Sequence, residues 1–191
     1  MRALFVLFAA AWFGAAAAAE VAGVKLPDRL RIGTGGPELV LNGAGLRTRF
    51  FLKVYAAGLY LEKKSTTTPA VLALQGPKRV SMHLLRNVSA KQILDALHDG
   101  VAANNSPAEL AKLKPQLDEL DAVMTGMGPI KEGDVVTLDY LPGTGTVVTV
   151  NGQAKGKPIA GTALYDALLR VWLGDDPVQD DLKKELLGKQ A

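Results

Sequence analysis

The chain has 191 residues, a formal net charge of +3 at neutral pH and no cysteine. A charge this small, without any run of five or more like charges, argues against nucleic acid as a partner. The absence of cysteine excludes disulfides and a cysteine nucleophile, so an ordinary apolar core must hold the chain together. A chain of this length is long enough to build such a core as one domain.

The first 19 residues have the pattern of an export signal. Arg2 gives a short basic start, residues 3–18 are almost wholly apolar, and Ala17 and Ala19 fit the small-residue rule for cleavage. We therefore expect a signal peptide at residues 1–19, one domain at residues 20–191, and a periplasmic or secreted location. No later stretch approaches the roughly 20 apolar residues that a membrane-spanning helix needs, so we expect no transmembrane segment in the mature chain.

The first half of the mature chain predicts mainly antiparallel sheet. A turn is expected at Gly43-Ala44-Gly45, and the apolar residues after it predict a long strand over Arg49–Leu61. Two-residue alternation puts Arg47 and Tyr55 on one face of this extended segment. A short helical turn is expected to begin near Pro69. Further extended segments are expected at Val21–Leu26, Leu30–Gly33, Glu38–Asn42 and Lys78–Asn87.

Two capping boxes in the middle of the chain predict two helices. Ser89 is followed three residues later by Gln92, and the apolar residues after them recur at helical spacing as far as Val101. The second box joins Ser106 to Glu109, with a proline at the first helical position. The two helices therefore adjoin near residues 104 and 105.

Strands return before the chain ends in helices. Asp134–Leu141 and Thr146–Val150 alternate as strands do, and Asn151-Gly152 is a strong hairpin signal. A buried helix is expected over Thr162–Leu173, and a last helix is expected to begin with Asp176 as its cap. Sheet segments separated from blocks of helices indicate an α+β fold in which helices cover one face of the sheet.

Several familiar catalytic and metal-binding patterns are missing from the sequence. The glycine-rich residues 33–36 lack the Lys-Ser/Thr of a phosphate loop, and no serine lies in a G-x-S-x-G elbow. His83 and His98 have no second histidine or carboxylate at a common ligand spacing. We expect neither a metal nor a cofactor, and we interpret both histidines as surface residues.

An apolar pocket that contains Arg47 is the candidate site that remains. A cation at one end of an apolar face suits an amphipathic acid or a phenolate, although an exposed strand end is the common place for a lone arginine. Asn104 ends a buried helical stripe, where an unpaired amide costs about 1 to 3 kcal/mol, so it either contacts a ligand or caps the helix. Tyr55 and Tyr165 are further candidates, with a core position as the alternative for Tyr165.

Two segments of the chain resemble the chalcone isomerase family. They are GAGLRTRFFLKVYAAGLYLE at residues 43–62 and PIAGTALYDALLRVWLGDDPVQDDLKKELLG at residues 158–188. The second resembles the ending of the family's exported bacterial members, and similarity extends over essentially the whole mature chain. The resemblance implies a chalcone isomerase-like open-faced β-sandwich, an antiparallel sheet covered by a layer of helices.

The resemblance also implies positions for the family's functional residues. The active-site arginine matches Arg47, and the asparagine of the cleft matches Asn104. The chain departs from the family pattern elsewhere, because Tyr55 and Tyr165 occupy positions of threonines and Leu97 occupies that of the catalytic tyrosine. We expect these five residues to line a ligand site, with Arg47 catalytic if the protein is an enzyme.

The family resemblance implies two functions for such a site. Family enzymes close a chalcone to a flavanone without a cofactor, as isomerases of the intramolecular lyase class. Losing one hydrogen-bond donor to the developing enolate typically costs about 10² to 10³ in rate, so the replacement of the tyrosine by Leu97 predicts impaired catalysis. Other family members bind a fatty acid, with its carboxylate on the arginine.

We therefore expect binding of a small amphipathic, fatty-acid-like molecule anchored by Arg47. The alternatives are a cofactor-independent isomerase acting on a chalcone-like enone and a non-catalytic periplasmic interaction module. The sequence leaves the ligand and the oligomeric state open.

Overall fold

Nine strands and five helices make up the part of the chain that the computed structural model describes, residues 18–33 and 35–189. The strands are β1 (Ala18–Val21), β2 (Val24–Pro27), β3 (Arg29–Arg31), β4 (Glu38–Arg49), β5 (Leu52–Leu61), β6 (Lys78–Leu84), β7 (Val135–Leu141), β8 (Gly145–Val150) and β9 (Gln153–Ile159). The helices are α1 (Thr68–Leu72), α2 (Ala90–Asn104), α3 (Pro107–Gly126), α4 (Ala163–Leu173) and α5 (Asp180–Leu186). The predicted α+β class is confirmed.

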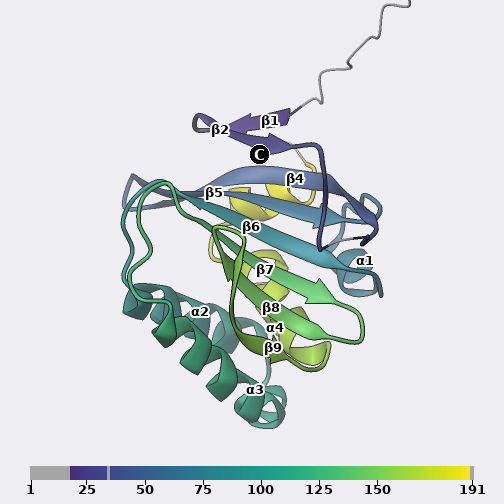
Figure 1. The fold of residues 1–191 in the computed structure, drawn as a ribbon, viewed down its shortest axis with the longest axis vertical. Coiled ribbons are helices and arrows are strands. Elements are labelled where there is room, and N and C mark those ends of the chain that lie inside the picture. The colour runs from purple at the N-terminus through teal and green to yellow at the C-terminus, as the bar shows by residue number, and fades with distance from the viewer. Residues whose placement is uncertain (1–17, 34, 190–191) are drawn as a thin grey trace, which may run out of the picture.

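One antiparallel sheet of seven strands forms the centre of the fold. Its strands follow chain order from β3 to β9, so every strand pairs with its neighbours in sequence. The strands β1 and β2 form a separate hairpin that packs beside β4 (Figure 1). Helices lie against one face of the sheet, and α2 and α3 lie on the side of the molecule opposite the β1–β2 hairpin (Figure 1).

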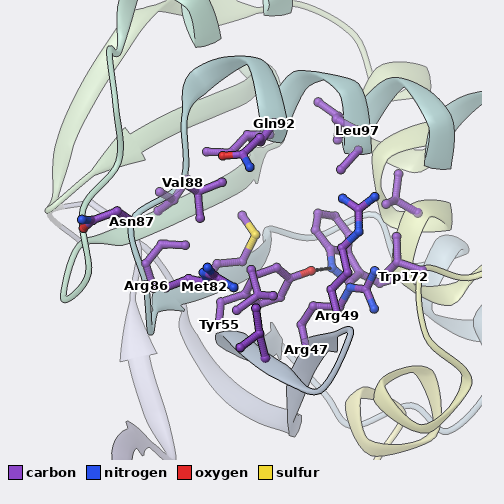
Figure 2. Close-up of a pocket in the computed structure, with 18 of the residues that line it drawn as sticks. Arg47, Arg49, Tyr55, Met82, Arg86, Asn87, Val88, Gln92, Leu97 and Trp172 are labelled. Carbon is purple, nitrogen blue, oxygen red and sulfur yellow. Dashed lines mark hydrogen bonds between the residues drawn. The ribbon is translucent and has the colours of Figure 1, made fainter.

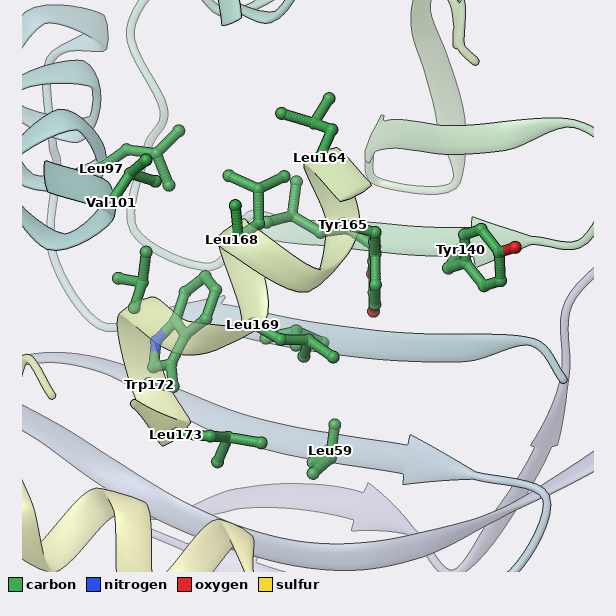
Figure 3. Close-up of a cluster of buried hydrophobic side chains, with 14 of the residues drawn as sticks. Leu59, Leu97, Val101, Tyr140, Leu164, Tyr165, Leu168, Leu169, Trp172 and Leu173 are labelled. Atoms are coloured by element: carbon green, nitrogen blue, oxygen red, sulfur yellow. The ribbon is translucent and has the colours of Figure 1, made fainter. Parts of the chain in front are cut away.

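The helix α4 forms the inner layer of the core. Eight of its eleven residues are buried, and Leu168, Leu169 and Trp172 belong to the main apolar cluster together with residues of the central strands (Figure 3). The helix α2 packs directly on α4 at Gly100, where a Cβ atom would lie 2.7 Å from Val171. This layer of helices on one sheet face confirms the predicted open-faced β-sandwich.

The opposite sheet face is covered only in part. The β1–β2 hairpin buries Leu26 against Leu39, Leu41 and Tyr60 in a second apolar cluster. The strand β5 is therefore buried on both faces along its second half, Ala56–Leu61. This explains why the sequence there is nearly continuous in apolar residues rather than alternating.

The turn predicted at Gly43-Ala44-Gly45 is wrong, because β4 continues through these residues to Arg49 and shows only a shift of pairing register between Leu41 and Gly43. The glycines are needed for close packing: a Cβ at Gly43 would overlap the carbonyl oxygens of Glu185 and Leu186, at the end of α5. The chain instead reverses at Phe50 and Phe51, between the paired residues Arg49 and Leu52.

Two other boundaries differ from the sequence-based expectations. The last helix begins at Asp180 with Gln179 as its cap, not at Asp176, because the backbone N–H of Val178 still bonds to the carbonyl of Val171. The hairpin expected at Asn151-Gly152 is present, and it leads into a strand, β9, that the sequence analysis does not predict. Both capping boxes and the helix turn at Pro69 are present as expected.

The amino terminus is described from Ala18 onward. Most of the expected signal peptide, residues 1–17, lies outside the described residues, and Ala18 and Ala19 pair with Pro27 and Leu26 as part of β1. Within the described residues, no helix is long and apolar enough to cross a membrane.

Lys78 is an ionisable residue enclosed in the core. Its side chain has no exposed surface, and its Nζ lies 5.0 Å from the ring centre of Tyr140 and 3.9 Å from Asp166 Oδ1. Among the described residues it has no hydrogen-bond partner. Burial lowers the pKa of Lys78 below its usual value of 10.5, and the nearby Asp166 offsets this only in part.

Replacing Gly43 by alanine is predicted to destabilise the protein. The added Cβ would push the end of α5 away from β4, and such overpacking typically costs about 1 to 3 kcal/mol. Urea denaturation measures this change in the free energy of unfolding. Gly126→Ala is the matched control, because a Cβ there meets nothing within 4 Å. Equal stability of the two variants would contradict the close approach.

The stability of the protein is predicted to rise at alkaline pH through Lys78. Its lowered pKa means that the unfolded chain binds the proton more tightly, so the free energy of unfolding increases as pH rises from the folded pKa toward 10.5. Lys78→Met removes this contribution. Denaturation of both proteins across that range should show a steeper rise for the wild type, and parallel pH profiles would refute the assignment.

Candidate functional site

A cavity of about 490 Å³ opens where the β4–β5 hairpin, the middle strands and the helical layer meet. Its walls come from β5, β6 and β7 on the sheet side and from α2, α3 and α4 on the helix side. Most of its lining residues are apolar: Phe50, Leu52, Val54, Met82, Leu84, Val88, Ile93, Ala96, Leu97, Met124, Val136, Leu138, Val171 and Val178. The walls therefore favour an apolar ligand body.

All charged residues that line the cavity are arginines: Arg47, Arg49 and Arg86. In Figure 2, Arg47 and Arg49 lie near Trp172, while Arg86 lies on the other side of Tyr55 and Met82. Within residues 18–33 and 35–189, none of the three forms an ion pair with a carboxylate. A guanidinium is always protonated in proteins, so the site carries uncompensated positive charge.

Arg47 is held in place by strand pairing and by the cap of α5. It lies opposite Tyr55 in the β4–β5 ladder, so the two side chains share a face across neighbouring strands rather than along one strand. Its Nη1 donates to the carbonyl of Thr48 at 2.6 Å and to Gln179 Oε1 at 3.3 Å. Gln179 also accepts from the Thr48 backbone N–H and donates to the carbonyl of Leu46.

Tyr55 presents a hydroxyl near Arg47. Its oxygen accepts a hydrogen bond from Trp172 Nε1 at 2.9 Å (Figure 2). Burial raises the pKa of Tyr55, and the bonds and charges of Trp172 and Arg47 offset this only in part. The phenol therefore stays protonated at neutral pH, and no acceptor among the described residues takes its hydrogen. It is placed to donate to a bound molecule.

The cavity brings together three of the five residues singled out from the sequence. Arg47, Tyr55 and Leu97 line it. Leu97 is 7% exposed and presents only an apolar side chain, so the helix α2 supplies no phenol at that position.

Asn104 and Tyr165 lie outside the cavity. Asn104 is the last residue of α2, where its amide donates to the carbonyls of Gly100 and Asp176 and accepts from the Asp176 backbone N–H. It ties α2 to the connection between α4 and α5, which agrees with the alternative of a structural role at the helix end. Tyr165 is 1% exposed and donates to the carbonyl of Leu138, which agrees with its alternative as a core residue.

Sequence reasoning did not identify Trp172, Gln179 or Arg86 as parts of the site. Trp172 was recognised only as a buried helix residue, and its bond to Tyr55 joins residues 117 positions apart. Gln179 carried no signal, because it follows a proline that suggested an earlier helix start. Arg86 comes just after an alternating strand, and its position beside a basic cavity depends on the path of the chain into α2.

The histidines lie away from the cavity. His98 Nε2 lies 2.7 Å from Asp121 Oδ1 on α3, and His83 Nε2 lies 3.2 Å from Ser81 Oγ on β6. His83 is thus a half-buried strand residue rather than an exposed one. In the described part of the chain, no group of three or more His, Cys, Asp or Glu residues is arranged to hold a metal ion.

Comparison with known proteins agrees with this architecture. Residues 18–188 match a family described as chalcone isomerase-like. The chain belongs to the chalcone isomerase-like family. No curated protein matches it.

The fold is also similar to that of a solved structure. A fatty-acid binding protein of Arabidopsis thaliana superimposes with a TM-score of 0.61 at 16% sequence identity, over 86% of this chain and 92% of that one. At this identity the match shows a common fold. The same architecture therefore occurs in a protein that is described as binding fatty acids.

Proposed function

We propose that this chalcone isomerase-like protein binds a small amphipathic acid of the fatty-acid type. The carboxylate lies on Arg47 and the hydrocarbon chain fills the apolar cavity. One observation carries the proposal: the only charges lining this cavity are three arginines without acidic partners among the described residues. An acid with an apolar body satisfies both the charge and the walls.

The geometry of Arg47 suits a carboxylate. Only its Nη1 is engaged by protein atoms in the described chain, so the Nε and Nη2 hydrogens remain for a ligand. A guanidinium binds a carboxylate through charge-assisted, frequently bidentate hydrogen bonds. Arg49 at the cavity edge and the Tyr55 hydroxyl add two more donors for the same group.

The cavity size and the structural relative support this proposal. A volume of about 490 Å³ lies within the range of typical small-molecule sites. The Arabidopsis protein of the same fold is a fatty-acid binding protein. A structure without a cavity beside Arg47 would have favoured the alternative of a non-catalytic interaction module. The cavity beside Arg47 supports ligand binding instead.

We also propose that the protein is exported to the periplasm or secreted after cleavage near Ala19. The basic and apolar pattern of the first residues supports this. Cleavage there leaves Glu20 and Val21 to pair with Lys25 and Val24 in the β1–β2 hairpin. The mass of the protein purified from the exported fraction tests it, because an uncut chain would retain residues 1–19.

Arg47→Gln is predicted to weaken fatty-acid binding by about tenfold to a hundredfold. The reason is the loss of a charged hydrogen bond worth about 1.5 to 3 kcal/mol. Titration calorimetry with palmitate measures the change. Arg29→Gln is the matched control, because Arg29 lies on β3, pairs with Glu38 on β4 and does not line the cavity.

The ligand series provides a second check on the same variant. The methyl ester of the acid should bind the wild type weakly and lose nothing further in Arg47→Gln. Each added methylene should tighten binding about fourfold until the cavity is filled, since a buried CH₂ contributes about 0.8 kcal/mol. If the ratio of acid affinity to ester affinity were the same in Arg47→Gln as in the wild type, the proposed anchor would be contradicted.

A cofactor-independent isomerase is the second candidate, favoured by the Tyr55 hydroxyl next to Arg47. We propose that its activity is impaired, because Leu97 presents no donor where the family resemblance implies a tyrosine. The rate at which chalcone absorbance is lost should therefore be about 10²- to 10³-fold lower than that of an enzyme with the donor. Rapid turnover that Arg47→Gln and Tyr55→Phe abolish would make the protein an enzyme.

A further inference from the structure

The tip of the β4–β5 hairpin has an unusual backbone. Arg49 pairs with Leu52, so Phe50 and Phe51 form a two-residue loop with φ angles of 49° and 64°. Hairpins of this kind require positive φ at both loop positions and normally use Asn-Gly or Asp-Gly. Bulky residues in that region are strained. The chain therefore keeps two phenylalanines at positions where the local backbone disfavours them.

The same residues are exposed to solvent. Phe50 is 81% exposed, Phe51 104% and Leu52 51%, and these are the large hydrophobic residues that the described chain leaves exposed. Their exposure also means that the rings add almost nothing to stability, because they are in water in the folded state as in the unfolded one. Strain and exposure at one turn point to a contact outside the folded chain.

Positive charge surrounds this apolar tip. Residues 39–61, which hold most of β4 and β5, contain no acidic residue but include Arg47, Arg49 and Lys53. Arg49 Cζ lies 5.5 Å from the ring centre of Phe50. Arg86 joins the same side of the molecule as a lining residue of the cavity. Aromatic rings at a tip with cations behind them match the chemistry of an anionic lipid surface.

We propose that the Phe50-Phe51 tip inserts into the headgroup region of an anionic phospholipid bilayer, where the cavity exchanges its acid. This rests on the proposed function and gives the ligand a source. Phe50, Leu52 and Arg49 line the cavity as well as the tip, so docking places the cavity mouth at the membrane. Arg49 and Lys53 contact lipid phosphates, and the rings enter the acyl boundary, while Arg47 stays with the carboxylate of the bound acid.

Vesicle flotation of the mature protein tests the docking. The wild type should float with vesicles of phosphatidylcholine containing phosphatidylglycerol and float less with phosphatidylcholine alone. Phe51→Gly should partition to the vesicles about tenfold less or weaker still, since it removes a ring that docking buries in the bilayer. Lys53→Gln should lose about fivefold on the anionic vesicles. Arg29→Gln, a change of charge away from the tip, is the matched control.

Phe51→Gly is expected to fold, because glycine is favoured at its position and relieves the strain. Neither Phe51 nor Lys53 lines the cavity, so calorimetry with palmitate in vesicle-free solution tests the proposed function separately. Failure of the wild type to float, or equal flotation of Phe51→Gly, overturns membrane docking whatever the palmitate result. Membrane docking is also overturned if the wild type sediments as a dimer and Phe51→Gly as a monomer, because the tip would then bind a second copy of the chain.

Discussion

The close contact between β4 and the C-terminal segment positions the candidate site. Gly43 allows the end of α5 to lie against the strand, where any side chain would overlap backbone oxygens. Asn42 donates to the carbonyl of Leu186 at 2.7 Å, and Gln179 bonds to the backbone on both sides of Arg47. These contacts keep β4 extended up to its tip and hold Arg47 at the wall of the cavity. A turn at Gly43 would have directed the arginine elsewhere.

The electrostatics of the cavity follow from that arrangement. The hairpin residues 39–61 provide positive charges and no carboxylates, while the walls contributed by α2, α3 and α4 are mainly apolar. An arginine near apolar walls interacts more strongly with an anion than it would in water, because the local dielectric is lower. The bond from Trp172 to Tyr55 turns the phenol into a donor beside the same arginine. The chemistry of the site therefore suits the proposed ligand, a negative group attached to an apolar body.

The tip of the hairpin and the cavity form one continuous structure. Phe50 contributes to both, and Phe51 extends beyond the cavity as the most exposed large apolar residue of the described chain. A binding protein for an acid of low solubility needs a route between the ligand's source and its own interior. In the proposed docking, the strained, basic, aromatic turn at the mouth of the cavity provides such a route. The proposal thus gives the strain at the turn and the chemistry of the site a common explanation.

The sequence by itself determined the α+β class, the family, both capped helices, the alternating strands and the choice of Arg47. These depend on local spacing, on cap residues that bond three positions away, and on segments that resemble known relatives. The tertiary structure alone decided that Gly43 lies within a strand, that the chain turns at two phenylalanines, and that Asn104 and Tyr165 make structural contacts. These features depend on contacts with elements that are distant in sequence. A glycine that makes room for α5 and a glycine that forms a turn, for example, cannot be distinguished from the sequence alone.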